Sequence, residues 1–262
     1  MGKICVELSC RLGNQMFQLA AGNHISKKYG KELLLNEAFD GAVTNSNAYT
    51  RNESILRDYR IMKLPELASE NFIEIEEDRN QEFTDFSICE KFENVYLRGM
   101  CQCDRYFTYD EVYELFGATE KEKEKYIEKY GDISDYVCIS VRRGDYVGNP
   151  AFVSPSPRWY EHCYHKYFEG LKIIVASDDI EWCKQNITFN NPIYIENETP
   201  EDTIKIKSLC KNHIIPPSTF SWWSAYLSKG KVVITDEWFG PAFKRLNEEN
   251  KYPKGWIKEK VI

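Results

Sequence analysis

The feature that most restricts how this chain can fold is a regular alternation of short apolar stretches with longer amphipathic ones. In the second half it predicts strands at 136–141, 171–176, 192–195, 213–215 and 231–235. Helices are predicted between them, at 157–168, 178–186, 199–210 and 221–227. Repeated β-α units of this kind form parallel sheets with helices on their faces. The second half is therefore expected to form one α/β lobe.

The N-terminal segment contains a further unit of the same kind. It consists of a strand at 3–8, a polar loop at 9–14, a helix at 16–29 ended by Gly30, and a strand at 31–36. Glycine at this place is typical of the left-handed residue that ends a helix. Residues 40–120 have weak periodicity, and the alternating charges of 120–125 are typical of a solvated helix face leading out of the first lobe.

These patterns predict an α/β protein with two Rossmann-like lobes facing a cleft. The N-terminal lobe is expected at 1–130 and the C-terminal lobe at 131–262. Ligands of open α/β sheets bind at the carboxyl ends of the strands, so the site is expected there.

Composition excludes several classes of function. A net charge of −7 argues against general nucleic-acid binding, which needs a basic face. No run approaches the roughly 18 to 20 apolar residues that span a bilayer, so no integral membrane segment is expected. Glu7 and Arg11 interrupt the N-terminus too early for a signal peptide. The chain is expected to be cytoplasmic, with its nine cysteines reduced and Cys5 and Cys138 buried.

Four polar segments follow predicted strands, at 11–15, 142–146, 177–179 and 217–223. The first leads into a helix, whose amides and dipole can hold an anion. It lacks the G-x-G-x-x-G pattern of dinucleotide-binding loops, and an ordinary turn capped by Asn14 is the alternative interpretation.

The second segment contains the adjacent Arg142 and Arg143. Neighbouring side chains at a strand end point in opposite directions, so one arginine can face a ligand while the other braces the turn. Guanidinium suits a diphosphate because it makes bidentate hydrogen bonds and keeps its proton. Asp145 could hold one guanidinium in place, and a surface salt bridge on a turn is the alternative interpretation.

In the third segment, Asp178 and Asp179 could accept hydrogen bonds from a ribose or a base N–H. Simple helix capping is the alternative, with Asp178 and Glu181 as a capping box. The fourth segment offers the Ser218 hydroxyl and backbone amides at a helix start, where an anion can bind. Its tryptophans are expected to serve packing.

The charge of a departing diphosphate must be neutralised by a bound cation or by fixed positive groups. No D-x-D sequence that could hold a cation occurs in the chain. Cys101 and Cys103 are a poor zinc half-site, because ligands one residue apart strain tetrahedral coordination. The arginine pair fits better, so neither a metal nor another cofactor is expected.

Four motifs together closely resemble those of the α-1,2-fucosyltransferases, glycosyltransferase family eleven. They occur in the family's order, as RLGNQMF at 11–17, VRRGDY at 141–146, SDD at 177–179 and STFSWWSAYL at 218–227. The resemblance covers nearly the whole chain and is weakest between residues 40 and 95. The related protein O-fucosyltransferases share an Arg-x-Gly-Asn-Gln loop and a similar arginine motif.

The resemblance implies a GT-B-like fold and an inverting, metal-independent enzyme. It would move L-fucose from GDP-fucose to a hydroxyl of an acceptor glycan, with O2 of a terminal galactose as the expected position. Its partners would therefore be a nucleotide-sugar donor and an acceptor glycan, and the first lobe would recognise the acceptor.

The resemblance also implies residue roles. Arg142 would be the main clamp on the diphosphate, supported by Arg143 and Asp145, and Arg11 and Asn14 would reach the donor from the first lobe. The expected catalytic residues are Arg142, Asp145 and Asn14. The expected donor-binding residues are Arg11, Arg142, Arg143, Asp178, Asp179, Ser218, Thr219, Phe220 and Ser221.

Two positions depart from the family. Ser140 stands where the family usually has histidine, which leaves base and sugar preference open. Residues 99–104, before Arg105, are also altered, which bears on acceptor choice. Transfer of rhamnose or colitose on the same scaffold, and a binding module without turnover, remain alternatives. The general base and the oligomeric state are open, since Asp145 is the nearest carboxylate but can be tied to arginine.

Overall fold

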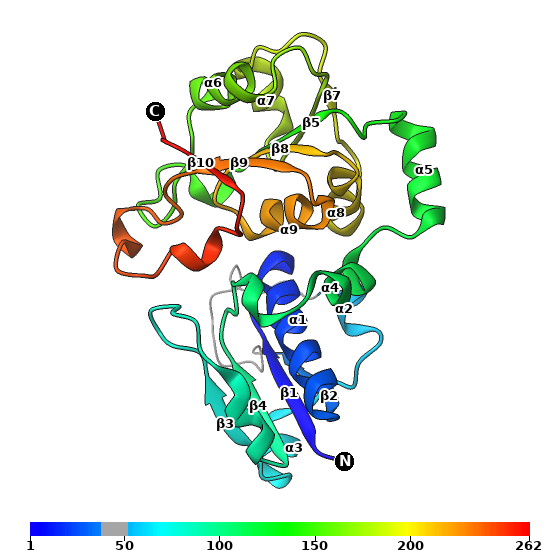
Figure 1. The fold of residues 1–262 in the computed structure, drawn as a ribbon, viewed down its shortest axis with the longest axis vertical. Helices are drawn as coiled ribbons and strands as arrows, with labels where there is room; N and C mark the ends of the chain where they lie inside the picture. Colours follow the sequence, from blue (N-terminus) through cyan, green and yellow to red (C-terminus); the bar gives the residue numbers. More distant parts are fainter. Residues whose placement is uncertain (38–51) are drawn as a thin grey trace. The chain divides into compact units, whose positions relative to one another are not determined.

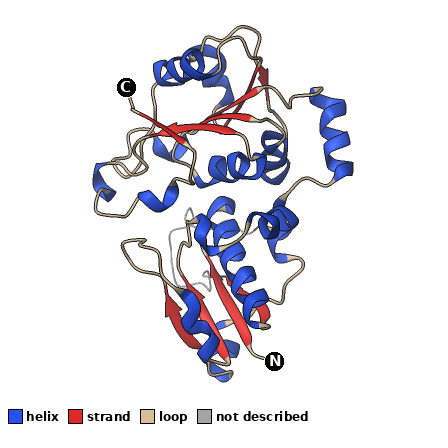
Figure 2. Cartoon of the chain, viewed as in Figure 1, coloured by secondary structure: helices blue, strands red, loops and turns tan. Residues whose placement is uncertain are grey.

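A computed structural model describes residues 1–37 and 52–262 of the chain (Figures 1 and 2). It divides into two compact units. Unit 1 consists of Met1–Leu115 and Glu249–Lys251. Unit 2 consists of Phe116–Glu248 and Tyr252–Ile262. Each unit is an α/β structure with a parallel sheet, which confirms the predicted fold class.

Unit 1 is built on a parallel sheet of the order β2-β1-β4-β3. Its strands are β1 (Lys3–Leu8), β2 (Glu32–Glu37), β3 (Ile73–Glu76) and β4 (Asn94–Arg98). The central strand β1 is almost entirely buried, which explains its apolar character. The sequence predicted β1 and β2, but β3 was missed because its alternating Glu residues are exposed and only Ile75 is half-buried.

Helix α1 (Leu12–Tyr29) packs against β1 and ends at Gly30 in the left-handed conformation, as predicted. At Gly22 the helix and the strand approach closely, and a Cβ atom there would lie 2.2 Å from the Val6 side chain. The helix begins four residues before the predicted start at 16, because its polar first turn is buried in the fold rather than forming a loop.

The remaining elements of unit 1 are short. They are α2 (Glu53–Leu56), α3 (Leu64–Ser69), η1 (Phe86–Lys91), η2 (Asp104–Tyr106), α4 (Tyr109–Phe116) and η5 (Glu249–Lys251). In η5 the chain returns to unit 1, where the Lys251 ammonium donates a hydrogen bond to Gln81 Oε1 at 2.6 Å. Glu77 is buried beside it and accepts hydrogen bonds from the amides of Met100 and Cys101.

Unit 2 is built on a larger parallel sheet of the order β10-β9-β8-β5-β6-β7. Its strands are β5 (Val137–Val141), β6 (Ile173–Ser177), β7 (Ile193–Tyr194), β8 (Asn212–Ile215), β9 (Lys231–Thr235) and β10 (Ile257–Glu259). From β5 the chain builds β6 and β7 on one side and then β8, β9 and β10 on the other. This is the strand order of a doubly wound nucleotide-binding fold, with its switch point between β5 and β8.

Helices cover both faces of this sheet (Figure 1). They are α6 (Pro157–Tyr167), α7 (Ile180–Asn186), α8 (Pro200–Ser208) and α9 (Thr219–Ser228), with 3-10 turns η3 (Gly144–Tyr146) and η4 (Pro241–Phe243). On β5, Val137, Ile139 and Val141 join one hydrophobic cluster, whereas Cys138 joins the other. Burial on both faces explains why β5 is continuously apolar rather than alternating.

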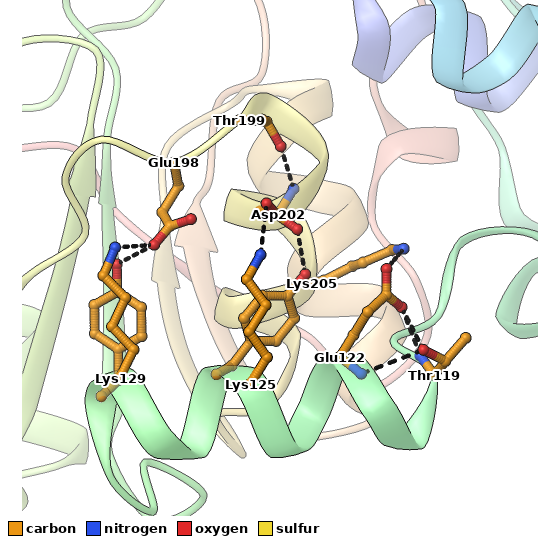
Figure 3. A network of polar contacts seen from close by, with 10 residues as sticks. Thr119, Glu122, Lys125, Lys129, Glu198, Thr199, Asp202 and Lys205 are labelled. Carbon is orange, nitrogen blue, oxygen red and sulfur yellow. Dashed lines mark hydrogen bonds and ion pairs between the residues drawn. The ribbon is translucent and has the colours of Figure 1, made fainter.

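Helix α5 (Glu120–Tyr130) belongs to unit 2, so the boundary between the units lies at 115/116 whereas the sequence analysis placed it at 130. The Tyr126 ring lies in a core cluster of unit 2, and its hydroxyl donates to Asp202 on α8. Figure 3 shows Glu122 and Lys129 on the same helix face, paired with Lys205 and Glu198. Most residues of the charge run 120–125 are exposed, as predicted for a solvated helix face, and Glu122 and Lys125 also pair with Lys205 and Asp202 of α8.

The nine cysteines, all of which lie in the described part of the chain, are free, and Cys5 and Cys138 are buried as predicted. Among residues 1–37 and 52–262, none of the helices combines the length and the apolar character that crossing a bilayer requires.

The position of Tyr126 generates a stability prediction. Tyr126→Ala is expected to lower the free energy of unfolding by about 3 to 5 kcal/mol, as for other buried aromatic truncations. The matched control Lys121→Ala, at an exposed position of the same helix, is expected to cost less than about 1 kcal/mol. Urea unfolding of both variants measures the difference, and equal midpoints would contradict the assignment of α5 to the core of unit 2.

Candidate donor-binding site

The candidate site of unit 2 lies at the carboxyl ends of three adjacent parallel strands. Arg142 and Arg143 follow β5, Asp178 and Asp179 follow β6, and Ser218 follows β8. Because β5 pairs with both β6 and β8, residues far apart in sequence meet at one edge of the sheet. This edge is the switch point at which doubly wound sheets bind ligands.

Two carboxylates hold the Arg142 guanidinium. Its Nη2 is paired with Asp145, and its Nη1 lies 2.9 Å from Asp178 Oδ2. About a fifth of the Arg142 side chain is exposed, at 22%. The group is therefore oriented by fixed partners while part of it remains open to a ligand.

Arg143 is held differently. Its Nε donates to Asp179 Oδ2 at 3.1 Å, and its guanidinium stacks on the Trp182 ring at 3.5 Å from the centroid. Its backbone N–H donates to Asp178 Oδ1 at 2.9 Å. This residue braces the turn after β5, as the sequence analysis expected of one member of the pair.

The predicted capping box of Asp178 with Glu181 is wrong, but the alternative of simple helix capping holds for the neighbouring Asp179. Helix α7 begins at Ile180, and Asp179 is its N-cap, accepting from the Trp182 amide at 3.3 Å. Asp178 instead pairs with the Arg142 guanidinium and accepts a hydrogen bond from the Arg143 backbone N–H. Gly144 allows this approach, because a Cβ atom there would lie 2.5 Å from Asp178 Oδ2.

The start of α9 offers a helix N-terminus without a side-chain cap. Ser218 is the N-cap residue, but its hydroxyl makes no capping hydrogen bond, and only its carbonyl accepts from the Trp222 amide, at 2.8 Å. Thr219 and Phe220 are partly exposed, whereas Ser218 and Ser221 are buried. Amides and the dipole at the start of such a helix favour an anion. Trp222 and Trp223 lie in the core, as expected.

Tyr146 joins the two halves of this site. Its hydroxyl donates to the carbonyl of Pro217 at 3.1 Å, which ties the arginine loop to the segment before α9. Its ring stacks on Phe152 with 4.2 Å between centroids, and the Arg142 guanidinium lies 5.2 Å from the same ring. Arg142 and the start of α9 are thereby linked through one side chain.

In unit 1, Arg11 is the N-cap residue of α1 and makes no side-chain capping hydrogen bond. Asn14 lies inside the first turn, so the alternative in which Asn14 caps the helix is wrong. Its Oδ1 instead accepts from Gln102 Nε2 at 2.8 Å, in the loop after β4.

Two glutamines of α1 fix the loop around Arg11. Gln18 accepts from the Ser9 amide at 2.9 Å and donates to the Gly99 carbonyl at 3.0 Å, joining the loops after β1 and β4. Gln15 donates to the Cys10 carbonyl at 3.0 Å. The sequence analysis gave these buried glutamines no role, because nothing in a single sequence marks a polar residue of a first turn as buried.

The structure brings most of the predicted residues together. At the carboxyl ends of β5 and β6, one polar cluster is formed by Arg142, Arg143, Asp145, Asp178 and Asp179. Its two guanidinium groups face three carboxylates, so an anion that binds there must draw on further positive groups. Arg11 and Asn14 belong to unit 1, and their contact with a donor stays a prediction.

Trp182, which supports Arg143, was not predicted as a site residue, and Gly144 and Tyr146 had no predicted role. Tyr146 and Gly144 stood within the quoted motif, whereas no sequence signal pointed to stacking by Trp182. Within the described residues, no group of three or more His, Cys, Asp or Glu side chains is arranged to hold a metal ion.

Comparison with known proteins identifies the family. The family model for glycosyl transferase family 11 matches residues 1–260. An α-1,2-colitosyltransferase of Escherichia coli is 28% identical over 98% of this chain and 99% of its own. The galactoside α-(1,2)-fucosyltransferase 1 of Homo sapiens is 29% identical over 37% of this chain and 30% of its own.

Solved structures support the fold. The fucosyltransferase NodZ from Bradyrhizobium superimposes with a TM-score of 0.53 at 13% identity, covering 90% of this chain and 96% of its own. A family 9 glycosyl transferase from Veillonella parvula gives a TM-score of 0.53 at 10% identity, covering 95% and 85%. With the family model matching nearly every residue, this chain belongs to glycosyltransferase family 11.

Proposed function

We propose that this chain transfers L-fucose, or the closely related colitose, from a guanosine diphosphate donor to a hydroxyl of a glycan. The observation that carries the proposal is the pair of arginines after β5, held by carboxylates and linked through Tyr146 to the uncapped start of α9. The arginine pair and the start of α9 can both bind a diphosphate, because a guanidinium makes charge-assisted hydrogen bonds and a helix start favours negative charge.

In the proposed transfer reaction, negative charge develops on the departing diphosphate. An acceptor hydroxyl attacks the anomeric carbon while the bond to the diphosphate breaks, which inverts the configuration at that carbon. Arg142 and the amides of Thr219 and Phe220 stabilise the charge that builds up on the departing diphosphate. The pairing of Arg142 with Asp145 and Asp178 orients the guanidinium in advance, so little reorganisation is needed during the reaction.

We assign Asp145 the role of orienting the Arg142 guanidinium. Its carboxylate is paired with Arg142 and is 45% exposed. A carboxylate that shares a guanidinium is a weak base, and a weak base suffices when departure of the leaving group runs ahead of attack. Asn14 and Arg11 remain proposed contacts of the donor from unit 1.

Colitose is the second candidate sugar because an α-1,2-colitosyltransferase aligns over nearly the full length of this chain. Colitose differs from L-fucose in lacking the hydroxyl at C3, so one scaffold can accommodate either. The named relatives favour the α-1,2 linkage, and O2 of a terminal galactose is the proposed acceptor position.

The experiment offers GDP-fucose, GDP-colitose and GDP-rhamnose to the purified protein with galactose-terminated oligosaccharides. Mass spectrometry of the products is expected to show addition of one 6-deoxyhexose or one 3,6-dideoxyhexose. GDP binding without transfer to any glycan of a broad array would instead indicate a binding module without turnover.

Arg142→Lys is expected to lower turnover roughly a hundred- to thousandfold, because a point charge cannot reproduce the guanidinium fork. Initial rates with saturating donor measure the effect. The control is Arg158→Lys on the exposed surface of α6, which should retain wild-type turnover. A folded Arg142→Lys protein with near wild-type turnover would show that the clamp is assigned to the wrong residue.

Transfer activity is expected to persist in saturating EDTA, because we assign neutralisation of the diphosphate to arginine and amide groups. Rates are compared before and after chelation, and again after manganese or magnesium is restored. A strict requirement for an added divalent cation would contradict the metal-independent mechanism.

A further inference from the structure

A buried glutamine of unit 1 holds the side chain of Asn14. Gln102 Nε2 donates a hydrogen bond to Asn14 Oδ1, and the two atoms are 2.8 Å apart. Gln102 lies in the loop after β4 and is only 8% exposed, whereas Asn14 lies in the first turn of α1, after β1, and is partly exposed. Because β1 and β4 are neighbours in a parallel sheet, the two residues meet at the carboxyl ends of these strands.

The backbone that carries Gln102 is held from two directions. The buried Glu77 carboxylate accepts hydrogen bonds from the backbone N–H groups of residues 100 and 101, each at 2.8 Å. Gln18 on α1 donates to the carbonyl of Gly99 at 3.0 Å. These contacts fix the point from which the Gln102 side chain extends, so its amide can impose one orientation on the amide that it contacts.

The direction of this hydrogen bond decides what Asn14 offers to a ligand. An asparagine amide has an acceptor oxygen on one side and two N–H donors on the other. The Asn14 oxygen accepts from Gln102, and among residues 1–37 and 52–262 the structure gives Asn14 Nδ2 no hydrogen-bond partner. Asn14 therefore presents N–H donors to a ligand. If the hydrogen bond ran in the other direction, Asn14 would present a carbonyl oxygen, which repels the oxygens of a phosphate.

We propose that Gln102 is a positioning residue, which holds the Asn14 amide so that its N–H groups donate to an oxygen of the nucleotide-sugar donor. This proposal rests on the proposed function, in which Asn14 contacts the donor from unit 1. Phosphate oxygens can only accept hydrogen bonds, so an amide that is already turned to donate binds them without the cost of reorientation.

A double-mutant cycle tests whether Gln102 acts through Asn14. Transfer rates are measured with GDP-fucose or GDP-colitose, whichever the wild type uses, for the wild type, Gln102→Met, Asn14→Ala and the double variant. Gln102→Met is expected to lower kcat/KM for the donor severalfold to roughly tenfold, because one hydrogen bond that holds the amide is lost. In the Asn14→Ala background the same substitution is expected to have no further effect, because the amide that Gln102 orients is absent.

Gln102→Glu tests the direction of the hydrogen bond. An ionised carboxylate can only accept, so the Asn14 amide must turn its N–H groups toward it and present its oxygen to the ligand. The loss of kcat/KM is therefore expected to exceed that of Gln102→Met and to reach roughly a hundredfold. This larger loss should also vanish in the Asn14→Ala background, which separates reorientation of the amide from a direct effect of the new charge.

Gln185→Met and Gln185→Glu are the matched controls. Gln185 is exposed on α7 in unit 2, and both substitutions there should retain wild-type kinetics. Thermal unfolding separates positioning from stability. Gln102→Met replaces an amide by an apolar side chain of similar size, and water can reach the partly exposed Asn14, so its Tm is expected to stay within a few degrees of the wild type.

Additive losses in the cycle would overturn the proposal, as would folded Gln102→Met and Gln102→Glu proteins with wild-type kcat/KM. If these variants transfer the sugar as the wild type does, the proposed function stands and only the positioning role of Gln102 fails. A wild-type protein that transfers no sugar from any nucleotide donor would instead refute the proposed function, and the positioning role with it.

Discussion

The arrangement of unit 2 depends on how two permanently charged guanidinium groups are held at the end of a buried strand. Asp178 makes the central contact, because one of its oxygens pairs with Arg142 and the other accepts the backbone N–H of Arg143. Arg142 follows β5 and Asp178 follows β6, so this contact exists only while the two strands are neighbours in a parallel sheet. The close approach at Gly144 follows from the same geometry. Formation of the sheet therefore also orients the two guanidinium groups.

In the described part of the chain, each unit contains one buried lysine, and the two lysines have different surroundings. In unit 1, Lys251, Glu77 and Gln81 lie together, and Glu77 also accepts two backbone amides. Such a satisfied network holds residues 249–251 in unit 1. In unit 2, the buried Lys207 ammonium lies 5.0 Å from the centroid of the Phe220 ring. A network in which every buried polar group has a partner favours a fixed structure.

The sequence predicted the elements whose burial follows from their own pattern. The strands β5, β6, β8 and β9 and the helices between them were found because apolar runs and helix ends leave clear signals. It missed β3, whose charged residues are exposed at a sheet edge, and it began α1 too late because Gln15 and Gln18 are polar yet buried. Local spacing predicted that Asp178 caps a helix, but its carboxylate pairs with Arg142, which follows another strand.

What the sequence determined by itself is the α/β class, the position of four polar segments after strands, and the membership of glycosyltransferase family 11 that their motifs indicated. These properties are local, because periodicity and short motifs are written along one stretch of chain. Tertiary structure alone decided which carboxylate holds which arginine, that Trp182 lies under Arg143, and that Lys207 is buried against the Phe220 ring. These properties depend on neighbours from separate strands and helices, and strand order decides which residues become neighbours.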